Sequence, residues 1–287
     1  MLPGNLLMTN TQFYVIYIVW LGSSMIVQLN FVYWMIYRAE LPWIEQFKIE
    51  KDQPWPWKVD PVAWRTLVVK SFWQCMFNNT FINVMMLSLY CHVIWNWQIP
   101  FTFDLESIPD SWTFLKHILI CIICEDFCFH MTHKAFHCKH KFFNLYGWFH
   151  KQHHEYMHPV SITSEYAHPF EYAFGNHFPS FVGMLLLGKR MHIWTIMVWG
   201  TIRILETHDG HSGYEFPWSI FRLIPFGSDA TYHIFHHSKN VGNYSSFMTI
   251  WDTIFDSNSE FYEAYPEGAR VDEHALPQPG REKELIK

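Results

Sequence analysis

Charged residues are scarce in this sequence, and the shortage is concentrated in two places. Only 16% of the 287 residues are Asp, Glu, Lys or Arg, against about 25% in a typical soluble domain. Residues 11–37 contain no charged residue, and residues 71–103 contain none apart from the titratable His92. Each run is longer than the roughly 20 residues that span a bilayer. The sequence therefore predicts an integral membrane protein.

Several other features are missing, and each absence excludes a class of protein. With a net charge of −6 and no basic run, the chain has no sign of a nucleic-acid partner. The first apolar run lacks a basic flank and a small-residue cleavage site, so we interpret it as a retained helix and not as a signal peptide. The six cysteines lie mostly in apolar segments and lack the two thiolate pairs, separated by a loop, of a four-thiolate metal site, so we expect them to be reduced.

Apolar runs also predict the organisation of the chain. We expect helices over residues 11–37 and 71–97, and a third from Trp112 into a stripe that ends at His137. Two apolar runs of ten residues then follow, and ten helical residues reach about 15 Å, which is half a bilayer. We predict an all-α integral membrane protein with about three spanning helices, a membrane hairpin and a cytosolic histidine-rich di-metal cap. The predicted regions are an N-terminal transmembrane region (1–111), a catalytic domain (112–260) with the hairpin at 178–200, and a cytosolic tail (261–287).

Basic residues predict which side of the membrane each loop occupies. Residues 38–70 carry six Lys or Arg, whereas residues 1–10 and 98–111 carry none. The positive-inside rule therefore places residues 38–70 in the cytosol. The third helix then emerges on the cytosolic side, and the hairpin returns the chain to that side. We accordingly expect the histidine-rich segments to meet at one cytosolic site.

What the sequence does contain in excess is histidine. Sixteen of its nineteen histidines lie between His130 and His237. They form HxxxH at His133 and two HxxHH clusters, a spacing that stacks imidazoles on one face of a helix. Neutral imidazoles suit iron, copper, zinc and nickel, and eight ligands exceed what one metal takes, so the pattern predicts two metals. The eight histidines of the clusters are His133, His137, His150, His153, His154, His233, His236 and His237.

Other kinds of metal protein fit the pattern less well. Residues 154–158 read His-Glu-Tyr-Met-His, the HExxH pattern of zinc hydrolases, but Pro159 follows directly and disfavours the helix on which such enzymes carry it. A carboxylate di-iron bundle needs two Glu-x-x-His motifs on helices, but the copies ending at His158 and His168 are each followed by proline, which disfavours helix. A histidine-rich metal transporter remains a rival from another class, although transporters place their ligands near the bilayer midplane. The membrane setting favours an oxygen-activating di-iron enzyme with a lipid substrate.

At this point the motifs resemble a known family. The sequence from Glu125 through the three clusters is similar to the fatty acid hydroxylase/sterol desaturase superfamily of membrane di-iron enzymes. Within it, several stretches resemble the methylsterol monooxygenases, or C-4 sterol methyl oxidases. The clearest of these are Glu165-Tyr-Ala-His168-Pro-Phe-Glu171, His211-Ser-Gly-Tyr214 and Trp251-Asp-Thr-Ile-Phe255.

The resemblance implies a reaction, its cofactors and a location. Such enzymes hold two iron ions, which zinc can replace on purification, and use O₂ with electrons from NAD(P)H through cytochrome b5 and its reductase. They reside in the endoplasmic reticulum membrane as multi-pass proteins and oxidise a 4-methyl sterol through alcohol and aldehyde to the carboxylate. By the same resemblance, the cluster histidines are iron ligands, and His168 and His211 complete the ligand set. Four further residues are expected to lie beside the ligands, namely Asp126, Glu206, Asp209 and His208.

Two departures leave related reactions open. The spacer between His137 and His150 is twelve residues, longer than we expect in animal methylsterol oxidases. His208-Asp-Gly is similar to a motif of the sterol C-5 desaturases. A sterol C-5 desaturase and a fatty-acyl or sphingolipid hydroxylase therefore remain alternatives, because hydrogen abstraction can end in hydroxyl transfer or in a double bond.

Overall fold

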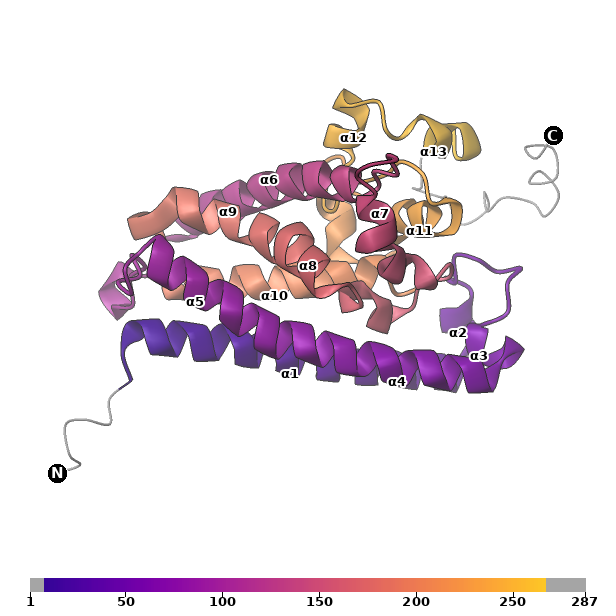
Figure 1. Ribbon diagram of the computed structural model, residues 1–287, viewed down its shortest axis with the longest axis horizontal. Coiled ribbons are helices and arrows are strands. Elements are labelled where there is room, and N and C mark those ends of the chain that lie inside the picture. The colour runs from indigo at the N-terminus through magenta and orange to yellow at the C-terminus, as the bar shows by residue number, and fades with distance from the viewer. Residues whose placement is uncertain (1–7, 267–287) are drawn as a thin grey trace.

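The computed structural model describes residues 8–266, and within this range the chain is helical and contains no β-strand. This confirms the prediction of an all-α protein. Long helices run side by side through most of the molecule (Figure 1). Short helices and loops gather toward one end of the molecule, where α7, α11, α12 and α13 lie (Figure 1). The long helices therefore form a frame that carries the shorter segments.

The first apolar run forms a single helix, α1 (Asn10–Ala39), close to the predicted boundaries. Thr9 begins it with a capping box, in which the Thr9 hydroxyl accepts from the Gln12 amide. At about 1.5 Å per residue, its 30 residues are long enough to cross a bilayer. It is the one candidate membrane span, by length and composition, among the helices described. Large apolar side chains such as Trp20 and Phe31 are exposed on its outer face.

The second apolar run lies in a longer helical segment than predicted, made of α4 (Pro61–Phe77), a π-helix η1 (Asn78–Ile82) and α5 (Asn83–Val93). The helix begins ten residues earlier than expected because Asp60 caps it and Pro61 occupies its first turn. Our boundary followed the loss of charge, but Arg65 and Lys70 lie on the helix itself.

The third predicted helix is confirmed as α6 (Ser111–Phe136). The predicted hairpin also folds back on itself: α9 (Phe178–Leu187) turns at η6 (Gly188–Arg190) into α10 (Ile193–Gly210). However, α10 extends ten residues beyond the apolar run. A Cβ on Gly183 of α9 would lie 2.7 Å from the Cα of Cys121, so glycine permits α6 and α9 to pack closely.

The remaining elements are short and connect the frame to the histidine-rich end. Phe261, at the start of the predicted cytosolic tail, is buried against Tyr232 and Phe235, and residues 267–287 of that tail lie outside the described range. The short elements are α2 (Pro42–Glu45), α3 (Pro56–Val59), η2 (Leu105–Ser107), α7 (Leu145–Trp148), η3 (His150–Glu155), η4 (Ser161–Glu165), α8 (Pro169–Glu171), η5 (Tyr172–His177), η7 (Ile220–Leu223), α11 (Ala230–Lys239), α12 (Ile250–Ile254) and α13 (Ser259–Ala264).

Candidate metal centre

Nine histidines converge in two groups at the end of the molecule where the short elements gather. Within each group, one ligand atom from every residue lies within 4.8 Å of the others. Eight are the histidines of the three clusters, and the ninth is His211. The first group is His133, His137, His150, His154 and His236, and the second is His153, His211, His233 and His237.

Four segments that are distant in sequence carry these side chains. The end of α6 supplies His133 and His137, the end of α10 supplies His211, and α11, capped by Asp229, supplies the last cluster. The middle cluster lies on η3, a 3-10 helix, and not on the α-helix that its spacing suggested. Within this cluster, His150 and His154 belong to the first group and His153 belongs to the second.

The second group presents unprotonated nitrogens to one another. The Nδ1 atom of His153 lies 3.3 Å from the Tyr166 carbonyl oxygen, and that of His211 lies 2.7 Å from the Thr207 carbonyl oxygen. Because a carbonyl only accepts, both Nδ1 atoms carry the proton, and both Nε2 atoms hold a lone pair. These two Nε2 atoms face each other at 3.5 Å. Both ring nitrogens of the buried His237 lack a partner among the described residues.

The first group has the same arrangement. His236 Nδ1 donates to the Gly242 carbonyl at 2.6 Å, and His133 Nδ1 donates to the Tyr244 carbonyl at 2.9 Å. His137 Nε2 lies 2.8 Å from His150 Nε2 and 3.2 Å from His236 Nε2, and it has only one proton to offer. Lone pairs that face each other at these distances repel, and a cation between them removes the repulsion. The donor set therefore fits metal ions bound by imidazole.

Burial keeps these rings in the form that binds a metal. It lowers the pKa of His153 to about 4 and the pKa of His236 to about 4, so both are neutral at pH 7. A neutral imidazole offers a lone pair without first losing a proton.

One carboxylate orients a ligand directly. Glu171 Oε1 lies 2.6 Å from His150 Nδ1, and both side chains are buried. An acid in this position fixes the tautomer and raises the basicity of the ring. The sequence does not predict this role of Glu171, because a separation of 21 residues from His150 carries no spacing signal.

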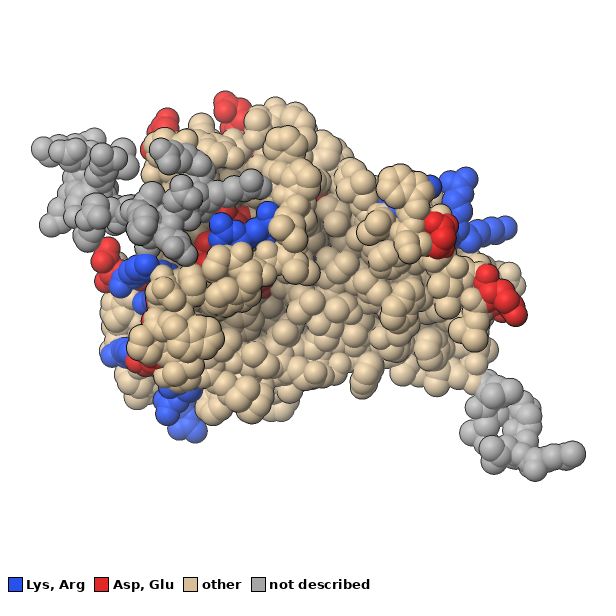
Figure 2. All heavy atoms as spheres, turned by 180° about the vertical axis from the view of Figure 1, so that it is seen from behind, with Lys and Arg blue, Asp and Glu red and all other residues tan. Residues whose placement is uncertain are grey.

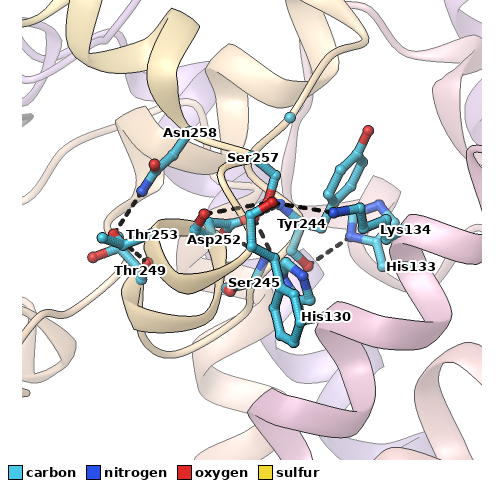
Figure 3. Close-up of polar contacts among 12 residues, drawn as sticks. His130, His133, Lys134, Tyr244, Ser245, Thr249, Asp252, Thr253, Ser257 and Asn258 are labelled. Atoms are coloured by element: carbon cyan, nitrogen blue, oxygen red, sulfur yellow. Dashed lines mark hydrogen bonds and ion pairs between the residues drawn. The ribbon is translucent and has the colours of Figure 1, made fainter.

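A second carboxylate, Asp252 of α12, holds the loop that orients His133 (Figure 3). Asp252 accepts from the amides of Tyr244 and Ser245 and from the hydroxyl of Ser257. This fixes the Tyr244 carbonyl that receives the proton of His133. His130, which lies on the same stripe of α6, contacts Asp252 at 3.3 Å and belongs to neither group.

The other predicted site residues belong to neither group. His168 caps α8, where its Nδ1 accepts from the Phe170 amide. Asp126 accepts from the amides of Ser246 and Phe247, and thereby ties α6 to the loop that contains Tyr244. The remaining three have other partners: Glu206 pairs with Arg203, Asp209 accepts from Ser219, and His208 contacts Asn30 and the Ile204 carbonyl.

A narrow cavity adjoins both groups on the side of the long helices. Aromatic rings of α6 and a cluster of polar groups from η4, η5 and α10 form its other walls. A molecule in this cavity would contact histidines of both groups at once. The lining residues are Phe129, His133, Phe136, His150, His153, Ser164, Glu171, Gly175, Asn176, Arg203, Thr207, His211 and His233.

Known proteins share sequence with the part of the chain that carries this site. A family model described as fatty acid hydroxylase matches residues 118–257, which include both histidine groups. Methylsterol monooxygenase 1 of Rattus norvegicus is 34% identical over 79% of this chain and 71% of its own length. The protein of that name in Danio rerio is 34% identical over 78% and 72%. A very-long-chain aldehyde decarbonylase of Oryza sativa subsp. japonica is 38% identical over 55% and 59%. No solved structure matches significantly.

Proposed function

The chain belongs to the methylsterol monooxygenase family, and we propose that it is an oxygen-dependent oxidoreductase that oxidises the C-4 methyl group of a sterol. The proposed sequence runs from methyl to alcohol, aldehyde and carboxylate, as a step of sterol biosynthesis. One observation carries the proposal. The structure brings nine histidines, from four segments, into two adjacent groups whose unprotonated nitrogens face inward beside a cavity.

We propose that each histidine group holds one iron ion. The ligands of the first would be the five histidines of the first group, and those of the second the four of the second group. Iron bound there supplies the chemistry of O₂ activation. The residues of the chain hold it: Glu171 and the carbonyls of Tyr244 and Gly242 keep ligand rings in the tautomer that binds metal. His168 is not included in this ligand set.

The lining of the cavity supports the proposal that an apolar part of the substrate, such as a methyl group, reacts there. Phe129 and Phe136 line it together with histidines of both groups, so a methyl group would lie between apolar walls and the metals. A substrate that fills this narrow cavity would exclude bulk water from the reacting position. Water exclusion strengthens electrostatic interactions and suppresses side reactions.

We also propose three spans, namely α1, the helical segment 61–93 and α6, with α9 and α10 as a membrane hairpin. Charged side chains lie mostly at the two ends of the molecule and leave a broad middle zone of one face almost bare (Figure 2). The basic segment 38–70 lies beside the histidine site, because Lys70 pairs with Glu155 at 2.8 Å. The positive-inside rule then favours a cytosolic metal site, as in an enzyme of the endoplasmic reticulum. Electrons would come from NAD(P)H through cytochrome b5 and its reductase.

A single incubation tests the proposed function. Iron-loaded protein in detergent receives a 4,4-dimethyl sterol, ¹⁸O₂, cytochrome b5, its reductase and NADH, and the products are identified by mass spectrometry. We expect 4-hydroxymethyl and 4-carboxy sterols that contain ¹⁸O. A ring alkene without ¹⁸O would identify a C-5 desaturase, and oxidation of acyl chains alone would identify an acyl or sphingolipid hydroxylase.

A further inference from the structure

Arg203 is the one cation among the residues that line the cavity beside the two histidine groups. It lies on α10, one helical turn before Thr207 and two turns before His211, so the three side chains share a face of the helix. The Arg203 side chain is only 12% exposed. A buried arginine beside a metal site requires partners, because desolvating a charge is costly.

Two acids hold the guanidinium in place. Arg203 Nε lies 2.7 Å from Glu125 of α6, and Nη1 lies 2.7 Å from Glu206, which also accepts from the hydroxyl of Ser246. The guanidinium packs over the Phe129 ring, with 5.5 Å between its central carbon and the ring centroid. Nη1 donates to Glu206, whereas Nε pairs with Glu125 by charge and has no hydrogen-bond partner among the described residues. A guanidinium has five N–H donors, so donors remain for an oxygen in the cavity that Arg203 lines.

The charge of the cluster indicates what kind of oxygen it binds. With one cation and two acids, the cluster formed by Glu125, Arg203 and Glu206 has no excess positive charge to attract an anion. It can still donate hydrogen bonds of fixed direction, which suits a neutral hydroxyl or carbonyl oxygen. In a sterol, the ring carbon next to C-4 carries a hydroxyl group. A methyl group on C-4 that faces the histidines therefore brings this hydroxyl into the same cavity.

We propose that Arg203 binds the 3-hydroxyl oxygen of the sterol and so directs the C-4 methyl group toward the two histidine groups. This inference rests on the proposed function. Glu125 and Glu206 are positioning residues, which keep the guanidinium plane fixed against α6. Arg203 thus selects substrates that carry an oxygen next to the reacting carbon.

Equilibrium binding, without turnover, tests this role. Iron-loaded protein is kept anaerobic and without reductant, and its affinity is measured for a 4,4-dimethyl sterol and for the same sterol without the 3-hydroxyl. We expect the wild type to bind the hydroxylated sterol at least about tenfold more tightly, as for a buried hydrogen bond to a charged group. Arg203→Met should bind both sterols equally, with the affinity of the wild type for the deoxy sterol.

Matched variants separate this role from a structural one. Arg203→Met leaves two acids unpaired, so the triple variant Glu125→Gln/Arg203→Met/Glu206→Gln, which removes all three charges, should lose the same preference. Arg203→Lys should recover part of it. Arg222→Met removes an arginine that pairs with Glu215 outside the cavity and should retain the full preference.

Each outcome decides one point. If Arg203→Met and the triple variant keep the wild-type preference for the hydroxylated sterol, the inference is wrong and the proposed function stands. If the wild type binds acyl chains but neither sterol, the proposed function fails and the inference fails with it.

Discussion

A histidine side chain becomes a metal ligand here through its second nitrogen. In several of these rings, Nδ1–H donates a hydrogen bond to a backbone carbonyl or to a carboxylate. The other nitrogen, Nε2, then carries no proton and is free to bind a metal. The sequence predicted the eight cluster histidines from spacing, and His211 from resemblance. Their partners were not predictable, because backbone carbonyls carry no sequence signal and Glu171 is brought to His150 only by tertiary folding.

The contact of Glu171 with His150 makes a prediction about metal affinity. In Glu171→Gln the side chain still accepts a hydrogen bond but loses its charge, so His150 becomes a weaker ligand. We expect metal affinity to fall about 10- to 100-fold, measured by competition with a chelator. Glu40→Gln, which alters an exposed pair with Lys58, is the control and should bind metal as the wild type does. Equal affinities in all three proteins would contradict this role for Glu171.

Burial of neutral rings makes a prediction about pH. The pKa values of His153 and His236 are about 4 in the folded protein, against about 6.5 when unfolded. Between these values the unfolded chain binds protons that the folded chain cannot bind. The free energy of unfolding of the metal-free protein should therefore fall as pH drops from 6.5 toward 4, by up to about 1.4 kcal/mol per pH unit for each histidine. Thermal unfolding in detergent at several pH values measures it, and a flat profile would contradict it.

At the scale of elements, the apolar runs predicted the long helices, but the spacing of the histidines did not predict the type of the short ones. The boundaries of α1 and α6 agree with the prediction because α1 spans the uncharged run and Asp110 caps α6 directly before the predicted start. The segment η3 is different, because its six residues give too little periodicity to separate a 3-10 helix from an α-helix. The π-helices η1 and η5 pack against each other through polar contacts such as Tyr172 with Asn79, which a sequence pattern does not reveal.

The packing of α6 on α9 makes a prediction about stability. Gly183→Ala places a Cβ 2.7 Å from backbone of α6, so the two helices must separate. We expect a loss of about 1–3 kcal/mol in the free energy of unfolding and weaker metal binding, since α6 carries His133 and His137. Gly210→Ala meets no atom within 4 Å and is the control for thermal unfolding. A Gly183→Ala protein as stable as this control would show that the helices adjust without cost.

At the scale of the whole molecule, the proposed topology predicts which loops share a side of the membrane. Single cysteines at Phe142 and Leu105, which are both exposed, are introduced into a variant whose native cysteines are replaced. In sealed microsomes, a membrane-impermeant thiol reagent should label the cysteine at 142 from the cytosolic side, and the cysteine at 105 only after permeabilisation. Labelling of both from the same side would contradict three spans with a cytosolic site.

The most direct test of the central claim is the iron content of variants that each disrupt one histidine group. Anaerobically loaded wild-type protein should contain two iron ions per chain, one for each group. His137→Ala/His154→Ala should lose the iron of the first group, and His211→Ala/His237→Ala that of the second, so each double variant should retain about one. A wild type that holds a single iron, or double variants that both retain two, would contradict an account in which two separate histidine groups form the metal centre.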